Sequence, residues 1–184
     1  MKAENLRDFL FPGVFNFPVD GTGAVGYNNT VLLFCRGERM DKVIVKVRGE
    51  QTGADGETNA IEVVAEGRHF EKNGRHYVLY DDHMEEEPIS TVLAIEPHRL
   101  RLTRNGAITQ DQYFMNGVES TSEYRTPFGS LKMSVTTRNM EIAYGTVSGE
   151  IHVDYAMALN GMWQSDNALH ITVSPDASEV GRLN

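Results

Sequence analysis

The stretch that decides the fold is GEIHVDYAMALNGMWQSDNALHITV, residues 149–173. Its first half carries apolar side chains at every second position, namely Ile151, Val153, Tyr155, Met157 and Leu159. The alternation returns at 169–173, and an Asn-Gly pair at 160–161 lies between the two halves. A period of two is typical of a strand with one buried face, and Asn-Gly supplies the positive φ angles that tight hairpins require. This stretch therefore predicts antiparallel β-structure.

The same two signals recur from residue 40 to residue 174. Alternating apolar residues mark further strands at 43–47, 61–66 and 131–137. Asp-Gly or Asn-Gly pairs also occur at 55–56, 73–74, 105–106 and 116–117. About 8–10 strands joined in sequence order predict an all-β fold, a closed up-and-down antiparallel barrel, which removes exposed sheet edges.

One residue breaks the alternation. Phe70 is out of phase with Ile61, Val63 and Ala65, although all four belong to one predicted strand region. We therefore expect a β-bulge or a barrel corner at Gly67.

The composition limits the classes of partner. The chain has 26 acidic and 17 basic residues, a net charge of -9, whereas nucleic acids and anionic membranes attract cationic surfaces. We expect neither partner. A single cysteine excludes a disulfide framework and a zinc-cysteine cluster. No uninterrupted apolar run approaches the ~20 residues that a spanning helix needs.

The first 39 residues differ in kind from the rest. They hold five of the eight phenylalanines and no histidine, and the run FLFPGVFNFP at 9–18 has neither strand nor helix periodicity. Purine-rich codons for Arg36-Gly37-Glu38-Arg39, directly before Met40, can spell a ribosome-binding site. We interpret 1–39 as a non-native leader or a disordered extension, 40–174 as the barrel domain and 175–184 as a flexible tail. The alternative is an ordered N-terminal strand or ligand lid.

Histidines invite a metal interpretation, which the spacing does not favour. His69, His76 and His83 are seven residues apart, but a turn at 73–74 sets His69 opposite Val78 rather than opposite His76. The acidic run at 81–87 lacks the alternating oxygen ligands of an EF-hand loop. We expect no metal site.

Catalytic motifs are also missing from the sequence. It contains no G-x-S-x-G elbow and no G-x-x-x-x-G-K-[ST] phosphate loop, and Cys35 has no histidine near it in sequence. We expect no enzyme and no cofactor, and keep catalysis as a third hypothesis.

A set of polar residues lies in phase with the apolar strand faces or next to a predicted turn. Its members are Arg104, Tyr124, Thr126, Thr137 and Tyr155. Polar groups that point into a barrel need a partner, water or a ligand. In one interpretation they plug one end of a filled barrel with a structural or interaction role. In the other they form the polar floor of a pocket for a small, partly apolar or acidic molecule.

Several motifs resemble the YwiB-like family of uncharacterised bacterial proteins. They are Glu66-Gly67-Arg68-His69-Phe70, Leu102-Thr103-Arg104-Asn105-Gly106, Tyr124-Arg125-Thr126-Pro127-Phe128-Gly129 and Gly149-Glu150-Ile151-His152-Val153-Asp154-Tyr155. The resemblance covers about residues 42–174 and leaves out the first forty. It implies a calycin-like, lipocalin-type closed barrel in a cytoplasmic protein, and it implies no activity.

Overall fold

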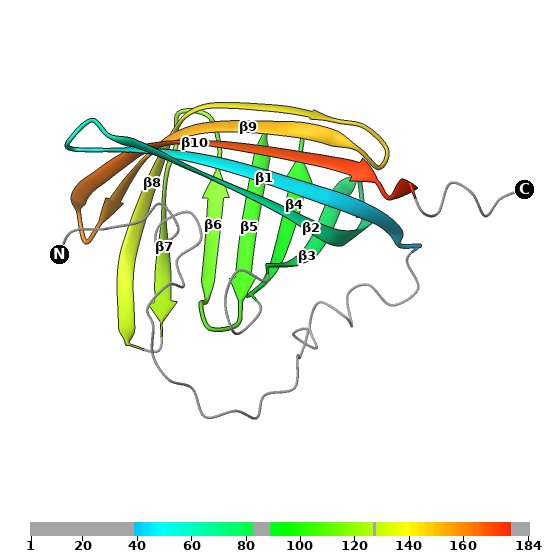
Figure 1. The fold of residues 1–184 in the computed structure, drawn as a ribbon, viewed down its shortest axis with the longest axis horizontal. Coiled ribbons are helices and arrows are strands. Elements are labelled where there is room, and N and C mark those ends of the chain that lie inside the picture. The colour runs from blue at the N-terminus through cyan, green and yellow to red at the C-terminus, as the bar shows by residue number, and fades with distance from the viewer. Residues whose placement is uncertain (1–38, 83–88, 127, 178–184) are drawn as a thin grey trace, which may run out of the picture.

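The computed structural model describes residues 39–82, 89–126 and 128–177, which form one antiparallel sheet (Figure 1). The strand order is β6-β5-β4-β3-β2-β1-β10-β9-β8-β7, so each strand pairs with its neighbours in sequence and β1 pairs with β10. The strands are β1 (Asp41–Gly53), β2 (Thr58–Lys72), β3 (Arg75–Asp82), β4 (Ile89–Glu96), β5 (Arg99–Asn105), β6 (Gln110–Phe114), β7 (Glu119–Thr126), β8 (Gly129–Tyr144), β9 (Gly149–Leu159) and β10 (Met162–Pro175).

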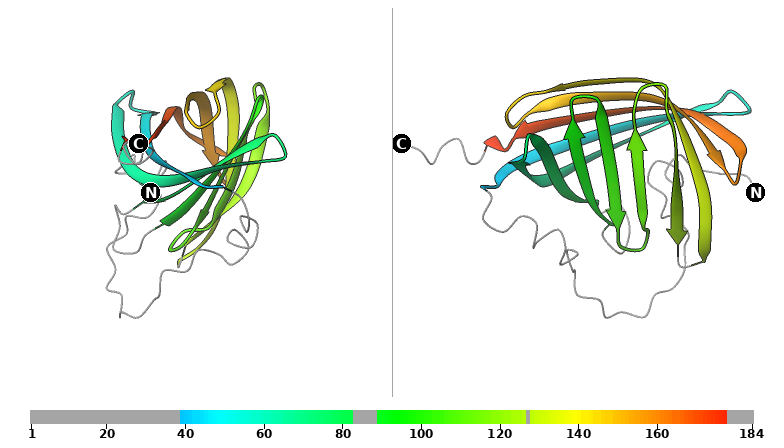
Figure 2. Two further views of the ribbon diagram at one scale, coloured as in Figure 1. Left: turned by 90° about the vertical axis from the view of Figure 1, so that its right-hand side faces the viewer. Right: turned by 180° about the vertical axis from the view of Figure 1, so that it is seen from behind.

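The sheet curls until its two end strands, β6 and β7, meet (Figure 2). One bridge joins them: the amide of Thr109 donates to the carbonyl of Arg125 at 3.1 Å, and the amide of Arg125 donates back at 3.0 Å. The β6–β7 loop is tied to β8 as well, because the Gly117 amide donates to the Thr137 carbonyl at 2.9 Å. The fold is therefore an all-β, up-and-down, nearly closed barrel of ten antiparallel strands, as the alternation predicts.

Four of the five predicted Asx-Gly pairs lie wholly between strands, and in the fifth Asn105 is the last residue of β5 and Gly106 follows it. At 73–74 both residues have positive φ, 55° and 73°, and at 160–161 the values are 49° and 82°. These are the signs of a two-residue type I′ turn, whose twist matches that of the strands it joins.

The alternating residues fill the inside of the barrel. Val43, Val45 and Val47 of β1 are buried, and so are the residues of β9 and β10 that share their face, Ile151, Val153, Leu169, Ile171 and Val173. Each fully buried aliphatic side chain contributes about 1.5–3 kcal/mol relative to an exposed one. The core therefore stabilises a sheet that one bridge alone would close weakly.

The expected bulge at Gly67 is wrong. The register runs without a break, with Gly67 opposite Val43 on β1 and opposite Tyr80 on β3. A Cβ at Gly67 would lie 2.8 Å from the carbonyl oxygen of Leu79, so this inward position is too crowded for a side chain. A glycine inside a strand can mark either a bulge or a site where another backbone approaches closely, and Gly67 is a site of close approach.

Phe70 is out of phase because it faces outward. It stacks on Tyr77 with 4.9 Å between ring centroids, and it packs with Leu79, Met40 and Val92 in a small cluster outside the main core. Register shifts occur elsewhere, between Thr137 and Asn139 and between Trp163 and Ser165, where no glycine marks them.

Some expectations concern residues outside the described ranges. These are the leader up to residue 38, the acidic loop at 83–87 with His83, and the tail from residue 178. Within the described ranges, no helix has the length and apolar character to cross a membrane.

Candidate functional site

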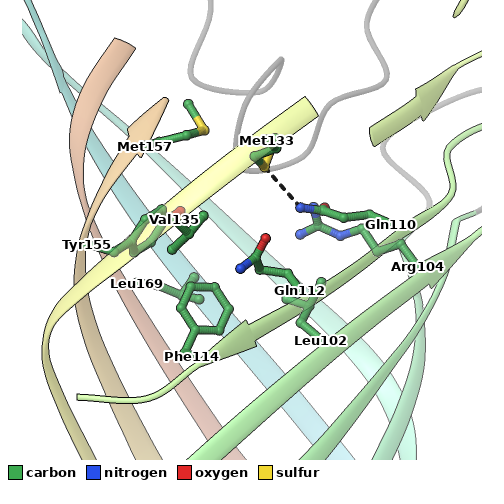
Figure 3. Close-up of a pocket in the computed structure, with 10 residues that line it drawn as sticks. All are labelled: Leu102, Arg104, Gln110, Gln112, Phe114, Met133, Val135, Tyr155, Met157 and Leu169. Atoms are coloured by element: carbon green, nitrogen blue, oxygen red, sulfur yellow. Dashed lines mark hydrogen bonds between the residues drawn. The ribbon is translucent and has the colours of Figure 1, made fainter. Parts of the chain in front are cut away.

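A small cavity lies inside the barrel beside β5 and β6 (Figure 3). Its volume of about 30 Å³ is room for about two water molecules. Apolar side chains form most of its wall, and Arg104, two glutamines and Tyr155 bring polar groups to it. The lining residues are Leu102, Arg104, Gln110, Gln112, Phe114, Met133, Val135, Tyr155, Met157 and Leu169.

Arg104 reaches the cavity because it continues the inward face of β5. Leu100, Leu102 and Arg104 are 0%, 5% and 6% exposed, so the alternation carries straight through to the guanidinium. Arg104 pairs with Gln110 across the β5–β6 hairpin, and its Nη1 donates to Gln110 Oε1 at 3.2 Å. A guanidinium keeps its charge under all ordinary conditions, so the cavity has a fixed cationic side.

Gln110 links that cationic side to the opposite wall. Its Nε2 lies 3.2 Å from the sulfur of Met133 on β8, a contact drawn as a dashed line in Figure 3. A thioether is a weak acceptor. The amide of Gln110 therefore holds Arg104 with its oxygen while its hydrogens lack a strong acceptor in this contact.

Side-chain hydrogen bonds of Gln112 take the place of backbone hydrogen bonds where β6 and β7 separate. Its Oε1 accepts from Ser122 Oγ at 2.8 Å, and its Nε2 donates to the Tyr113 carbonyl at 2.9 Å and to Ser120 Oγ. Ser120 Oγ in turn donates to the Tyr113 carbonyl at 2.5 Å. These side-chain bonds satisfy groups along the gap between the two strands, which we call the β6–β7 seam.

Tyr155 and Thr137 are paired neighbours on β9 and β8, on the far wall from Arg104. Burial raises the pKa of the Tyr155 phenol, while the positive charge of Arg104 acts in the opposite direction, so the hydroxyl stays protonated at neutral pH. Thr137 is 1% exposed, and its Oγ1 has no hydrogen-bond partner among the described residues. The cavity wall thus offers the Tyr155 phenol, and the unsatisfied Thr137 hydroxyl lies beside that residue on the neighbouring strand.

The structure brings together part of the predicted polar set. Arg104 and Tyr155 line the cavity, and Tyr124 and Thr137 are buried in the same core without lining it. Thr126 does not join them. Its hydroxyl donates to the Gly129 carbonyl at 3.1 Å and accepts from the Phe128 amide at 3.1 Å, so it stabilises the β7–β8 turn.

Sequence reasoning did not single out Gln110 and Gln112. Both share parity with Ile108 and Phe114, which are 2% and 4% exposed, so the parity rule used for Arg104 applies to them. The parity rule could not show that β6 pairs with only one neighbouring strand along its length, and that it therefore needs polar side chains at the seam.

Together these features define a class: a nearly closed antiparallel barrel with a packed core and a small, mostly apolar cavity that Arg104 and two glutamines line. Residues 45–171 match the model of the family described as "Domain of unknown function (DUF1934)". The chain belongs to this family.

Two relatives support the fold. The chain is 23% identical over 103 residues to the uncharacterised β-barrel protein YwiB of Bacillus subtilis (strain 168), covering 56% of this chain and 72% of YwiB. It is also similar to the crystal structure of the ywiB protein from Bacillus subtilis, with a TM-score of 0.71 and 19% identity over 78% of this chain and 99% of that one. At this identity the likeness concerns the fold.

Proposed function

We propose that the barrel binds a small, partly apolar molecule through an acidic group, a carboxylate or a phosphate, placed against Arg104. The observation that carries this proposal is a buried guanidinium on the wall of a mostly apolar cavity, to which the Gln110 and Gln112 amides and the Tyr155 hydroxyl bring further groups that can donate hydrogen bonds. A planar guanidinium matches a carboxylate or phosphate with two parallel hydrogen bonds.

The size of the cavity defines how such a molecule would fit. Space for about two water molecules suits the oxygens of one acidic group, which would displace that water. The apolar remainder needs more room than the cavity has. Met133 and Met157 lie on its wall, and unbranched thioether side chains repack readily. We therefore expect these two side chains to move when a ligand binds.

The proposal is binding rather than catalysis, without a cofactor. The polar groups on the cavity wall are an arginine, two amides and a protonated phenol, and none of these is a general base or nucleophile at neutral pH. We further propose a cytoplasmic location, which the resemblance and the single cysteine support, and no nucleic-acid or membrane partner, which the charge of -9 supports.

A second candidate is a filled barrel with a structural or protein-interaction role. The same 30 Å³ favours it, because side chains already occupy nearly all of the lumen. In that case the bond between Arg104 and Gln110 serves stability alone.

Replacing Arg104 with methionine separates the two candidates. If Arg104 anchors an acid, small carboxylates and phosphate monoesters at about 100 times Kd stabilise the native protein by about 2.7 kcal/mol and leave Arg104→Met unaffected. If the barrel is filled, no probe stabilises either protein, and the substitution costs about 1–3 kcal/mol through the unpaired Gln110 amide. Thermal melts with and without each probe measure both quantities.

Arg101→Met is the matched control. Arg101 lies on the same strand with its side chain on the outer face, where it makes two bonds to Asp111 at 2.8 and 2.5 Å. The Arg101→Met substitution removes the same charge from the same strand, so we expect this variant to keep the full stabilisation by the probe. A loss of response in both variants would mean that the probe senses net charge and not the cavity, and the proposal would be wrong.

A further inference from the structure

A second cluster of polar side chains lies where β1 and β3 begin and where β2 and β8 end. It consists of Asp41, His69, His76 and Tyr144, and none of the four lines the cavity beside Arg104. His69 is 2% exposed, so its ring needs partners within the protein. We call Asp41, His69 and His76 the histidine relay.

The two imidazoles meet diagonally across β2 and β3. His69 is opposite Val78, as the turn at 73–74 predicts, and His76 is opposite Glu71. Neighbours one step along the diagonal share a face of the sheet, and long side chains span that distance. The Nε2 of His69 therefore lies only 3.1 Å from the Nδ1 of His76.

The geometry is that of a hydrogen bond and not of a metal chelate. The ring centroids are 5.3 Å apart and the rings are tilted by 26°. The distance between the ring centroids is close to the sum of the nitrogen–nitrogen distance and the two ring radii. The two facing nitrogens therefore lie close to the line that joins the ring centroids. Their lone-pair axes point at each other rather than at a common third point. Consistent with this, the described residues contain no group of three or more His, Cys, Asp or Glu that could hold a metal.

Asp41 determines the direction of this hydrogen bond. The other nitrogen of His69, Nδ1, lies 3.8 Å from Asp41 Oδ2 and makes no hydrogen bond among the described residues. A lone pair on Nδ1 would face a carboxylate charge, whereas an N–H there would be attracted by it. With its hydrogen on Nδ1, neutral His69 can only accept at Nε2, so the Nδ1–H of His76 is the donor.

We propose that Asp41 fixes the tautomers of the histidine relay, so that both neutral imidazoles carry their hydrogen on Nδ1. His76 then donates its Nδ1–H to Nε2 of His69, and His69 turns its own Nδ1–H toward Asp41. The one imidazole nitrogen of the pair left as an acceptor for a group outside it is Nε2 of His76.

The surroundings disfavour charge on His69. Burial, and then the charge of His76, lower the pKa of His69, while Asp41 and Glu71 act in the opposite direction. His76 is half-buried, and the centre of the Tyr144 ring lies 4.8 Å from the centre of its own ring. Arg39 lies 3.4 Å from Asp41.

Protonation of His69 comes at a cost to folding. A histidine whose pKa is lowered in the folded state binds a proton more readily in the unfolded chain. The stability that neutral His69 contributes is therefore present above its unfolded pKa of 6.5 and is lost as the pH falls below that value.

Nitrogen-15 NMR of the full chain tests the relay through long-range couplings within each imidazole. At pH 8 we expect both His69 and His76 to show a protonated Nδ1 and an unprotonated Nε2. His152 and His170 are exposed on the outer face of β9 and β10 and serve as references in the same spectra. A hydrogen on Nε2 of His69 or on Nε2 of His76 at pH 8 would overturn the proposal.

Asp41→Asn tests the part played by the carboxylate. Without the charge at Asp41, we expect His69 to lose its preference for the Nδ1–H form. Asp166→Asn removes the same charge from an exposed ion pair with Arg138 on other strands and should leave that preference unchanged. An unchanged His69 tautomer in Asp41→Asn would show that Asp41 does not direct the relay.

Discussion

Replacing Gln112 with leucine is expected to destabilise the barrel by about 1–3 kcal/mol, because it leaves the buried Ser122 hydroxyl without its acceptor. Gln112 is 2% exposed, and its amide joins Ser122, Ser120 and the Tyr113 carbonyl along the β6–β7 seam. Leucine has a similar volume, so the loss reports the hydrogen bonds rather than a cavity. Urea unfolding monitored by circular dichroism measures the change.

Gln164→Leu is the control for this experiment. Gln164 also uses its amide on a backbone carbonyl, that of Met162 at 3.0 Å, but this bond is exposed to solvent. We expect a change within about 0.5 kcal/mol there. Equal effects in the two variants would mean that the seam is not held by Gln112, and that β6 and β7 are closed in another way.

Replacing Gly149 with alanine is expected to cost about 1–3 kcal/mol, since it forces a methyl group into a packed region. A Cβ at Gly149 would lie 2.5 Å from the Ala143 carbonyl oxygen and 2.6 Å from Tyr144 Cα. Both contacts are with backbone, which cannot rotate away as a flexible side chain can. The β8–β9 pairing would therefore have to shift where Gly149 opposes Tyr144.

Gly145→Ala tests whether this effect belongs to the position. Gly145 is in the same β8–β9 connection, but a Cβ there would meet only the Ser148 carbonyl, at an ordinary 3.4 Å. We expect little change in the melting temperature of that variant. A tolerated Gly149→Ala would contradict the close approach of β8 and β9 at this point.

The fold was accessible from sequence because two local signals repeat in it. Alternation identifies the buried face of each strand, and Asx-Gly pairs such as those at 73–74 and 160–161 mark the turns. Neither signal depends on distant parts of the chain. The same alternation also placed Arg104 correctly on the inward face of β5.

What could not be predicted depends on contacts between strands. The outward burial of Phe70 needs Met40 and Val92, which lie far from it in sequence. The seam of β6 and β7 is a property of how the barrel closes, so the role of Gln112 has no local signature. Likewise, the register correctly places His69 opposite Val78, but the bond to His76 arises from side-chain reach along the diagonal.

Native mass spectrometry of the full chain, purified from its own host, tests the central claim of ligand binding most directly. If the cavity beside Arg104 holds an acidic molecule, the native protein should carry an added mass that is released on denaturation, and Arg104→Met should lack it while Arg101→Met retains it. The contradicting result is a mass equal to that of the chain alone in the native protein and in both variants. It would exclude ligand binding and leave the structural or protein-interaction role of a filled barrel.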